Sequence, residues 1–251
     1  MPITETLLDH LNADAPVRDV LMGAFWTAVL LDTNPVRCGL ASTLRGGERH
    51  QGPPIPEAGG LVNYKARQLA EWLRSPQTLR ASIGMAAYNA LLEHDDTTWV
   101  EMNASEVILE RGAGRRVAVI GHFPFVEEVR RTAETCWVLE LDPRPGDVHA
   151  DRADELLPQA DVVAITSTSL INHTFDDLIP LCRDDALVIM LGPSTPLTPC
   201  LFDERIDVLS GTVVEQAERV LRSIAQGATF RQIKRTGGLR LVTMTQEDRL
   251  I

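Results

Sequence analysis

The chain has 251 residues, 44% of them hydrophobic, and its mean hydropathy is near zero. These values are typical of a globular protein with one large or two small domains, and they exclude a disordered or fibrous chain. The formal net charge of −11 argues against a nucleic-acid partner, because phosphates are bound by clustered lysine and arginine side chains.

The first part of the chain predicts a small α+β domain. Apolar residues at helical spacing predict a helix over residues 3–11. Three runs rich in Val, Leu, Trp and Thr, at 18–21, 25–31 and 36–43, predict an antiparallel meander. Residues 44–60 hold five glycines and three prolines and therefore predict a long loop.

Two helices are expected to complete this domain. Apolar residues recur at helical spacing over residues 61–73, and Ser75-Pro76 opens a second helix that runs to residue 92. The polar stretch 94–98 predicts a linker, and a short helix is predicted over 103–111, where glycines end it. We therefore predict a first domain over residues 1–95, a linker helix over 96–112 and a second domain over 113–251.

The second domain alternates strands with helices, as a doubly wound parallel sheet requires. The stretch RRVAVIGHFPFVEEVR, from Arg115 to Arg130, has the pattern of a buried strand, a tight turn and a helix. Helices are predicted over 177–182 and 215–225. The predicted strands are residues 117–120, 137–141, 162–166, 187–191 and 208–209. The fold class is thus α/β, with a Rossmann-like second domain.

The second strand of this sheet ends in an acid, Glu140, and Asp142 follows shortly after it. In nucleotide-binding α/β folds an acid at this place binds ribose hydroxyls. The phosphate fingerprint is absent, however, because His122-Phe123-Pro124-Phe125 follows Gly121 without further glycines. The sequence therefore predicts a Rossmann-like scaffold with an altered first loop rather than an ordinary dinucleotide site.

Polar residues follow several of the predicted strands at the edge where such folds bind ligands. Hydroxyls, an amide, carboxylates and imidazoles favour a hydroxylated or anionic small molecule, over which Arg45 of the long loop would close. The alternative is that the hydroxyls and Asn172 only cap helices. The candidate ligand-binding residues are Arg45, Gly121, His122, Phe123, Glu140, Asp142, Thr166, Ser167, Thr168, Asn172, Thr174, Gly192, Pro193, Ser194 and Thr195.

His122 and Glu140 are the candidate catalytic residues, since an imidazole beside the first strand suits general-base or metal-ligand chemistry. The candidate metal ligands are His50, His122 and His173, but no HxxxH or HExxH motif brings two ligands together. The possible cofactors are therefore a divalent metal, S-adenosylmethionine or a nucleotide. A structural role for His122, buried beside Phe123 and Phe125, is the competing interpretation.

Location and assembly follow from weaker signals. No apolar run approaches the roughly 20 residues of a transmembrane helix, and acidic residues without a basic leader open the chain, so we expect a cytoplasmic protein without a membrane partner. Four widely spaced cysteines without a CxxC motif predict buried thiols. A homodimer is the oligomeric state expected for such a protein.

Many short motifs, in order along most of the chain, resemble those of the putative heavy-metal chelation proteins, a family of unknown function. The resemblance implies an enolase N-terminal-like domain followed by a Rossmann-like domain, with a site between them. It implies no established catalytic residue. The motifs are FWTAV from Phe25, CGLASTLR from Cys38, SIGMAA from Ser82, GHFPF from Gly121, DPRPGD from Asp142, the segment 166–174 and GPSTPL from Gly192.

Three functions are consistent with these patterns. The first is a protein that binds a small hydroxylated or anionic ligand in the interdomain cleft and makes or handles a metal chelator. The second is an enzyme, either a transferase that uses a nucleotide or S-adenosylmethionine, or a hydrolase or condensing enzyme acting on pterin-like or flavin-like molecules. The third is a non-catalytic protein that binds metal directly.

Overall fold

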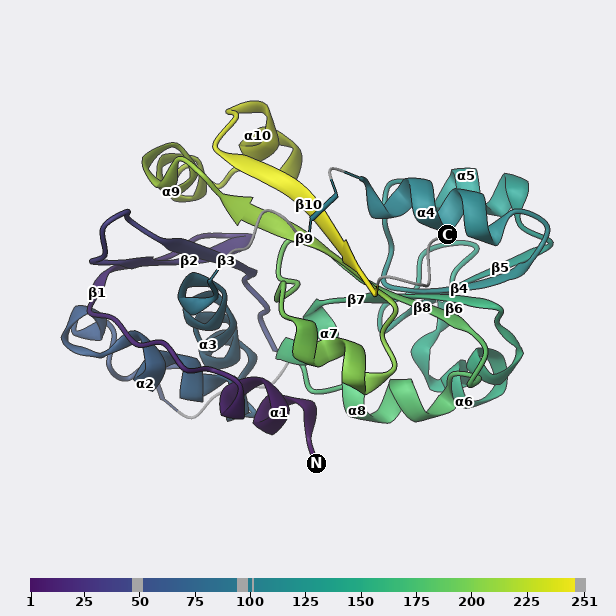
Figure 1. The fold of residues 1–251 in the computed structure, drawn as a ribbon, viewed down its shortest axis with the longest axis horizontal. Helices are drawn as coiled ribbons and strands as arrows, with labels where there is room; N and C mark the ends of the chain where they lie inside the picture. The colour runs from purple at the N-terminus through teal and green to yellow at the C-terminus, as the bar shows by residue number, and fades with distance from the viewer. Residues whose placement is uncertain (47–51, 94–98, 101, 247–251) are drawn as a thin grey trace.

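The structure is a computed structural model that describes residues 1–46, 52–93, 99–100 and 102–246. It contains a three-stranded antiparallel sheet and a seven-stranded, mostly parallel sheet (Figure 1). The predicted fold class, a small α+β half followed by a Rossmann-like half, is confirmed. None of the described helices is long and apolar enough to cross a bilayer.

The N-terminal half packs helices on one face of its small sheet. Apolar residues on that face, including Val29 and Leu31, lie in one core with Leu7, Leu69 and Ile83 of the helices. The elements are α1 (Ile3–Asp9), β1 (Val17–Met22), β2 (Trp26–Leu31), β3 (Cys38–Ser42), α2 (Ala66–Ala70) and α3 (Thr78–Leu91).

The single helix predicted over residues 61–73 is wrong in detail, because the chain is extended at Lys65. Lys65 forms an isolated bridge with Pro16, and Ala66 N donates to Ala15 O over 2.9 Å. This pairing with the segment before β1 divides the stretch into a 3₁₀ turn (Leu61–Asn63), the short helix α2 and a second 3₁₀ turn (Glu71–Arg74). Helical periodicity alone does not reveal such a long-range contact.

The seven strands of the C-terminal half lie in the order β10-β9-β8-β7-β4-β5-β6. Strands β5 and β6 are added on one side of β4, and strands β7 to β10 on its other side, so the strand order reverses between β4 and β7. All neighbouring pairs are parallel except β9 and β10. Strands β6 and β10 are additions to the predicted set. The strands are β4 (Arg116–Ile120), β5 (Thr135–Glu140), β6 (Val148–His149), β7 (Val162–Thr166), β8 (Leu187–Leu191), β9 (Val208–Val214) and β10 (Leu239–Thr245).

Helices cover both faces of this sheet (Figure 1). Val117 and Val119 of β4 pack with α4 (Ala104–Gly112) and α5 (Val126–Thr132), whereas Ala118 and Ile120 belong to the core on the opposite face. Successive side chains of a strand point to opposite faces, which explains why the continuous apolar run fills two cores. The opposite core contains α6 (Ala153–Leu156), α7 (Thr168–Ile171) and α8 (Phe175–Leu178).

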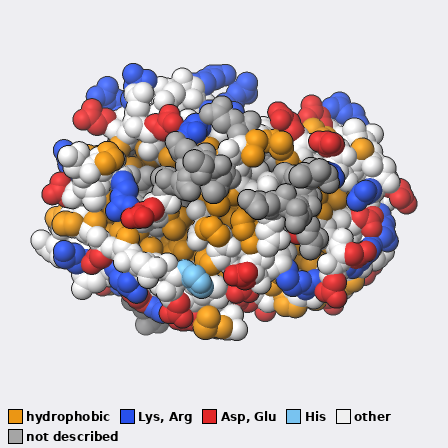
Figure 2. Space-filling model, in the orientation of Figure 1, with side chains coloured by type: hydrophobic (Ala, Val, Ile, Leu, Met, Phe, Trp, Pro, Cys, Tyr) orange, Lys and Arg blue, Asp and Glu red, His pale blue; other side chains and the backbone are white. Residues whose placement is uncertain are grey.

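The last two helices leave the large sheet and cover the outer face of the small one (Figure 1). Val220 and Ile224 of α9 (Ala217–Ala225) and Ile233 of α10 (Phe230–Arg235) form a separate core with Ala28 and Leu40. The three-stranded sheet is thus covered on both faces, by helices from both halves of the chain. In Figure 2 charged side chains gather around the periphery of the view, while hydrophobic ones reach the surface near its middle.

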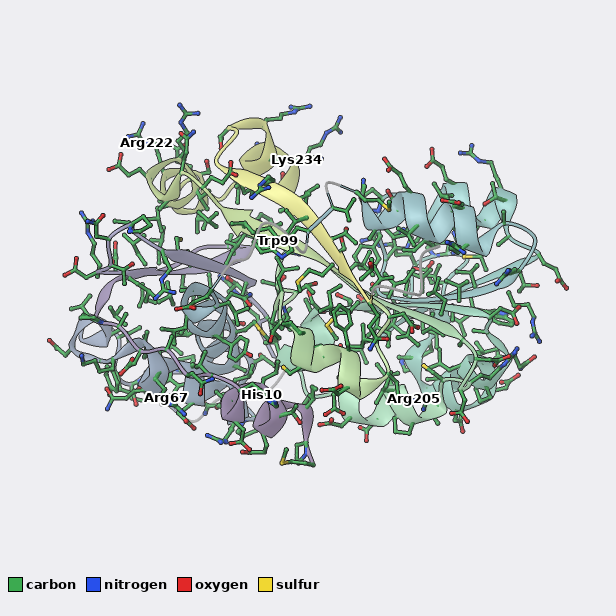
Figure 3. The ribbon with its side chains drawn as sticks, in the orientation of Figure 1. His10, Arg67, Trp99, Arg205, Arg222 and Lys234 are labelled. Carbon is green, nitrogen blue, oxygen red and sulfur yellow. The ribbon has the colours of Figure 1, made fainter. Side chains whose placement is uncertain are left out.

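The segment that enters the second half pairs with the sheet edge. Val100 N donates to Thr243 O over 2.9 Å, and Thr243 N donates to Val100 O over 3.0 Å. Trp99 lies beside β10 (Figure 3), where its ring is 5.5 Å from the Arg240 guanidinium carbon. The edge strand β10 is therefore partly protected.

Asp161, just before β7, forms hydrogen bonds with two arginines at the edge of the sheet where the parallel strands begin. Its carboxylate accepts hydrogen bonds from Arg116 N and Nε, each over 3.0 Å, and from Arg116 Nη2 over 2.7 Å. Arg183 Nη1 donates over 2.8 Å. The hydrogen bonds from Arg116 are the main reason that the pKa of Asp161 is held far below its usual value, against the opposing effect of desolvation.

Candidate functional site

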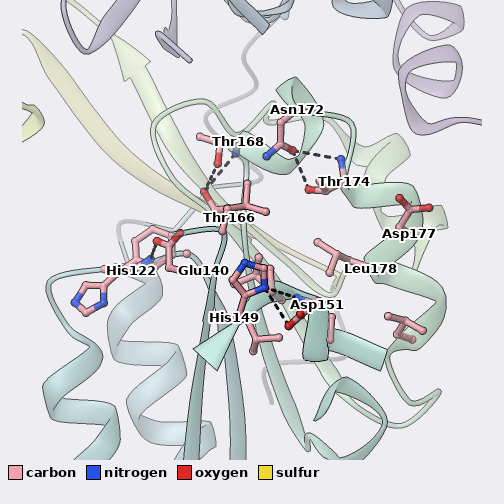
Figure 4. A pocket seen from close by; sticks show the side chains of 18 of the residues that line it. His122, Glu140, His149, Asp151, Thr166, Thr168, Asn172, Thr174, Asp177 and Leu178 are labelled. Carbon is pink, nitrogen blue, oxygen red and sulfur yellow. Dashed lines mark hydrogen bonds and ion pairs between the residues drawn. The ribbon is translucent and has the colours of Figure 1, made fainter. Parts of the chain in front are cut away.

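A cavity of about 670 Å³ lies at the carboxyl ends of β4, β5 and β7, where the strand order reverses (Figure 4). We call it the sheet-edge cavity. Ligands of open α/β folds bind at this position because loops diverge there and leave a crevice. Eight of the predicted ligand-binding residues line it, namely Gly121, His122, Phe123, Glu140, Thr166, Thr168, Asn172 and Thr174.

Glu140, at the end of β5, anchors the turn after β4. Its Oε1 accepts a hydrogen bond of 2.6 Å from the backbone N of His122. The turn itself needs Gly121, whose φ of +101° is rarely adopted by residues with a side chain. Oε2 of Glu140 accepts no hydrogen bond from the described residues, so half of this carboxylate is available to a ligand in the cavity.

The imidazole of His122 is held by a buried carboxylate. His122 Nδ1 lies 2.8 Å from Oδ2 of Asp147, whose side chain is fully buried. Arg130 Nη2 donates to the other oxygen over 2.8 Å, and Arg144 N donates to Oδ2 over 3.2 Å. Burial raises the pKa of Asp147, but the hydrogen bonds from His122, Arg144 and Arg130 together hold that pKa below its usual value.

This arrangement directs the His122 ring away from the middle of the cavity (Figure 4). His122 is therefore a lining residue whose ring does not project into the cavity. Asp147, which fixes the ring, is not among the residues predicted for the site, although it closes the DPRPGD segment. Its partner lies 25 positions earlier in the chain, and no local pattern reveals such a pair.

Hydroxyl and amide groups form the opposite wall. Thr166 Oγ1 and Thr168 Oγ1 lie 2.9 Å apart, and Thr168 N donates to Thr166 Oγ1 over 3.3 Å. Asn172 Oδ1 accepts from Thr174 Oγ1 over 2.8 Å. The side-chain nitrogen of Asn172 forms no hydrogen bond with the described residues and can donate to a ligand, with the oxygen and nitrogen assigned by the hydrogen bonds.

Acidic residues dominate the charge of the sheet-edge cavity. Glu140, Asp151 and Asp177 line it, and Asp151 pairs with His149 at 3.0 Å. Among the described residues that line this cavity there is no lysine or arginine. The cavity therefore suits a neutral, hydroxylated or cationic molecule better than a phosphate or another anion. His149, Asp151 and Asp177 are further lining residues that were not predicted.

A second cavity, of about 560 Å³, lies between the two halves and is lined by Ser167, Gly192 and Pro193 of the predicted set. We call it the interdomain cavity. It shares Phe123 and two threonines, Thr166 and Thr168, with the sheet-edge cavity. The predicted polar edge is thus divided between two neighbouring cavities.

Two other predicted residues hold the halves together. Ser194 Oγ accepts a hydrogen bond of 2.8 Å from Ser42 N, and His173 Nε2 lies 2.8 Å from Ser75 O. Thr195 is buried. Arg45 and Asp142 are exposed and line neither cavity, and His50 lies outside the described residues.

The donor groups do not converge on a metal site. Within the described part of the chain, no group of three or more His, Cys, Asp or Glu residues could hold a metal ion. Cys38, Cys182 and Cys200 are buried free thiols, and Cys136 is half-buried. Burial raises the pKa of Cys38 to about 12 and that of Cys182 to about 11, which disfavours the thiolate that metals bind.

Comparison with known proteins gives consistent matches for both halves. Residues 4–92 and 103–243 match two family models, each described as "Putative heavy-metal chelation". An uncharacterized protein of Methanocaldococcus jannaschii is 26% identical over 203 residues, which cover 78% of this chain and 77% of that protein.

Two crystal structures of proteins of unknown function share the fold along nearly the whole chain. The one from Desulfitobacterium hafniense has a TM-score of 0.84 and 24% identity, covering 97% of this chain and 98% of that one. The one from Pyrococcus horikoshii has a TM-score of 0.83 and 19% identity, covering 98% of each chain. At these identities the likeness concerns the fold alone.

Proposed function

Because the chain belongs to the family described as "Putative heavy-metal chelation", we propose that it acts in metal handling by binding a hydroxylated small molecule in the sheet-edge cavity. In this proposal the small molecule, a metal chelator or its precursor, carries the metal-binding groups. The protein's own side chains bind and orient that molecule. The observation that carries the proposal is the position of Glu140 at the carboxyl end of β5, next to β4, with one carboxylate oxygen available.

Glu140 offers one carboxylate oxygen, Oε2, as an acceptor for a ligand hydroxyl. Its Oε1 is fixed by His122 N, so the carboxylate is already oriented before a ligand arrives. A preorganised carboxylate accepting hydroxyl hydrogens forms charge-assisted hydrogen bonds, which contribute about 1.5 to 3 kcal/mol each. The hydroxyls of Thr166 and Thr168 face the same cavity and offer further contacts.

The charge of the cavity favours ligands without phosphate. Glu140, Asp151 and Asp177 would repel a pyrophosphate, and no lysine or arginine among the described lining residues would offset them. A ribose-bearing cation satisfies both requirements. A transferase that uses S-adenosylmethionine is therefore the second candidate function, since that cofactor combines a ribose with a positively charged sulfonium.

Replacing Glu140 with glutamine tests the proposal. The amide keeps the acceptor for His122 N but removes the charge, so the turn should persist while hydroxyl binding weakens. We expect adenosine and S-adenosylmethionine to bind the native protein more tightly than AMP, and the E140Q variant to raise their Kd by about tenfold to a hundredfold. Isothermal titration calorimetry measures each Kd, with thermal denaturation as a check on folding.

The matched control is Asp142→Asn, which removes an exposed carboxylate two residues away that lines neither cavity. It should leave all three Kd values unchanged. If E140Q binds adenosine as the native protein does, or if AMP is the tightest ligand, the assignment of Glu140 to hydroxyl recognition is wrong.

Direct metal binding gives a separate expectation. Because the described residues contain no cluster of metal-binding side chains, Zn²⁺ and Ni²⁺ titrated into the protein alone should bind weakly, at a Kd above about 10 µM. The His122→Ala variant should not change this value, since the ring already pairs with Asp147. Tight stoichiometric uptake that is lost in His122→Ala would instead support the direct-binding alternative.

A further inference from the structure

The interdomain cavity differs from the sheet-edge cavity in its aromatic walls. Trp26 of β2 and Phe230 of α10 lie on one side, with ring centroids 5.5 Å apart. Phe123 and Phe125 stack on another side at 5.2 Å, with an angle of 13° between their planes. Walls built from ring faces and edges favour a flat, unsaturated ligand.

Its charge is also opposite. Arg231 and Lys234 of α10 line the interdomain cavity, and Figure 3 shows Lys234 next to β10. Neither forms an ion pair with another described residue. No aspartate or glutamate is found among the described residues that line the cavity. The cavity also receives the N-terminus of the nine-residue helix α4, through Asn103, Ala104 and Ser105, which adds partial positive charge.

Two buried polar groups bordering this cavity have no partner. Ser167 is 1% exposed, and its Oγ forms no hydrogen bond with the described residues. The indole nitrogen of Trp26, Nε1, is likewise buried without a hydrogen-bond acceptor. Buried polar groups in native proteins are almost always hydrogen-bonded, and these two unsatisfied donors belong to residues that line the cavity. Both can donate to an acceptor oxygen.

We propose that the interdomain cavity is a second binding site, for a planar aromatic molecule that carries a carboxylate or a similar anionic group. The ring lies among Trp26, Phe123 and Phe230, and the anionic group meets Lys234, Arg231 and the start of α4. Because the two cavities share Phe123, Thr166 and Thr168, the aromatic acid lies directly beside the sheet-edge cavity. This inference stands on its own observations and does not depend on the proposed function.

The test removes the negative charge from the ligand and, separately, the positive charges from the protein. The probes are 2-naphthoate and 2-naphthamide, which have nearly the same shape and differ in charge, titrated by calorimetry into the full chain. The native protein should bind the acid at least tenfold more tightly than the amide. In the variant Arg231→Gln/Lys234→Gln the acid should lose at least tenfold in affinity and the amide little, so that the preference disappears. Both side chains are exposed, so folding should not be affected.

Further variants separate this site from its neighbours. Arg235→Gln, on the same helix but outside the cavity, should bind 2-naphthoate as the native protein does. Ser167→Ala should weaken both probes about equally, because it removes an uncharged donor. Equal affinity of the native protein for acid and amide, no binding of either, or an equal loss in Arg235→Gln would each overturn the proposal.

The experiments test the two binding proposals independently, so that one can be wrong while the other holds. If the interdomain site is correct, E140Q keeps its affinity for 2-naphthoate, and the Arg231→Gln/Lys234→Gln variant keeps its affinity for adenosine. Loss of 2-naphthoate binding in E140Q, with thermal stability unchanged, would place the acid in the sheet-edge cavity and overturn the assignment.

Discussion

Replacing Gly39 with alanine is expected to lower the free energy of unfolding by about 3 kcal/mol. Gly39 lies in β3, directly against α3. A Cβ atom at this position would lie 2.0 Å from Ala86 O and 2.3 Å from Ala90 N. Both contacts are with the backbone of α3, which cannot move without disturbing the core on its other sides. The added methyl group must therefore push the sheet and the helix apart.

Thermal and urea denaturation measure this effect. For a chain of this size the Tm should fall by about 6 to 12 °C. The control is Gly60→Ala, where a Cβ would lie 3.4 Å from its nearest neighbour, Glu57 O, and where φ is −116°. That variant should stay within about 0.5 kcal/mol of the native protein. Equal stability of the two variants would mean that β3 and α3 are not packed as closely as described.

Replacing Asp161 with asparagine is expected to lower the free energy of unfolding by about 2 to 3 kcal/mol at pH 7. The carboxylate is about three-quarters buried, with 24% of the side chain exposed, and accepts hydrogen bonds from two arginines. Asparagine keeps one acceptor oxygen, but it removes the charge and places amide hydrogens opposite the donor groups of Arg116 and Arg183. The expected loss is smaller than for a fully buried ion pair, because both arginines are partly exposed and water screens their charges.

The same carboxylate predicts a pH dependence. Its pKa is lower in the folded state than in the unfolded state, so its contribution is complete above the unfolded pKa of about 4 and is lost as the pH falls through the folded pKa. The difference between the native protein and Asp161→Asn should therefore shrink as the pH falls from 7 to 3. Urea denaturation across this range measures it.

Asp185→Asn is the control, since this exposed carboxylate pairs with the same Arg183 from the solvent side. Because this pair is exposed to solvent, Asp185→Asn should lower the unfolding free energy much less at pH 7 than Asp161→Asn does. A difference for Asp161→Asn that stays constant down to pH 3 would show that the loss does not come from the charge of the carboxylate.

Much of the fold is predictable because it depends on local patterns. Apolar runs bounded by glycine and charge located β4, β5, β7 and β8, and their alternation with helices predicted the parallel sheet. The two-residue strand β6 carries too short a pattern to be recognised. Strand β10 has apolar residues at Leu239, Leu241 and Val242, but its antiparallel pairing with β9 depends on contacts distant in sequence.

For the candidate site, the sequence predicted only the edge of the sheet at which it lies. Periodicity placed Glu140, Thr166 and Gly192 at or just after the ends of strands, and the three do lie at one end of the sheet. It could not show that Phe123, Thr166 and Thr168 lie between two cavities of opposite charge. The positive charge of the second cavity comes from Arg231 and Lys234, on a helix that follows the last parallel strand, and no local pattern relates that helix to the sheet edge. Nor could it distinguish lining residues from Ser194, whose hydroxyl is occupied by Ser42.

Because α9 and α10 pack on the three-stranded sheet, the C-terminal half of the chain supplies part of the hydrophobic core of the N-terminal half. A fragment ending near residue 92 would lack both helices and would leave Ala28, Leu30 and Leu40 in contact with water. Such a face on an open sheet favours self-association. The N-terminal half therefore depends on helices that lie far later in the chain, and its outer face remains uncovered until those helices have been synthesised.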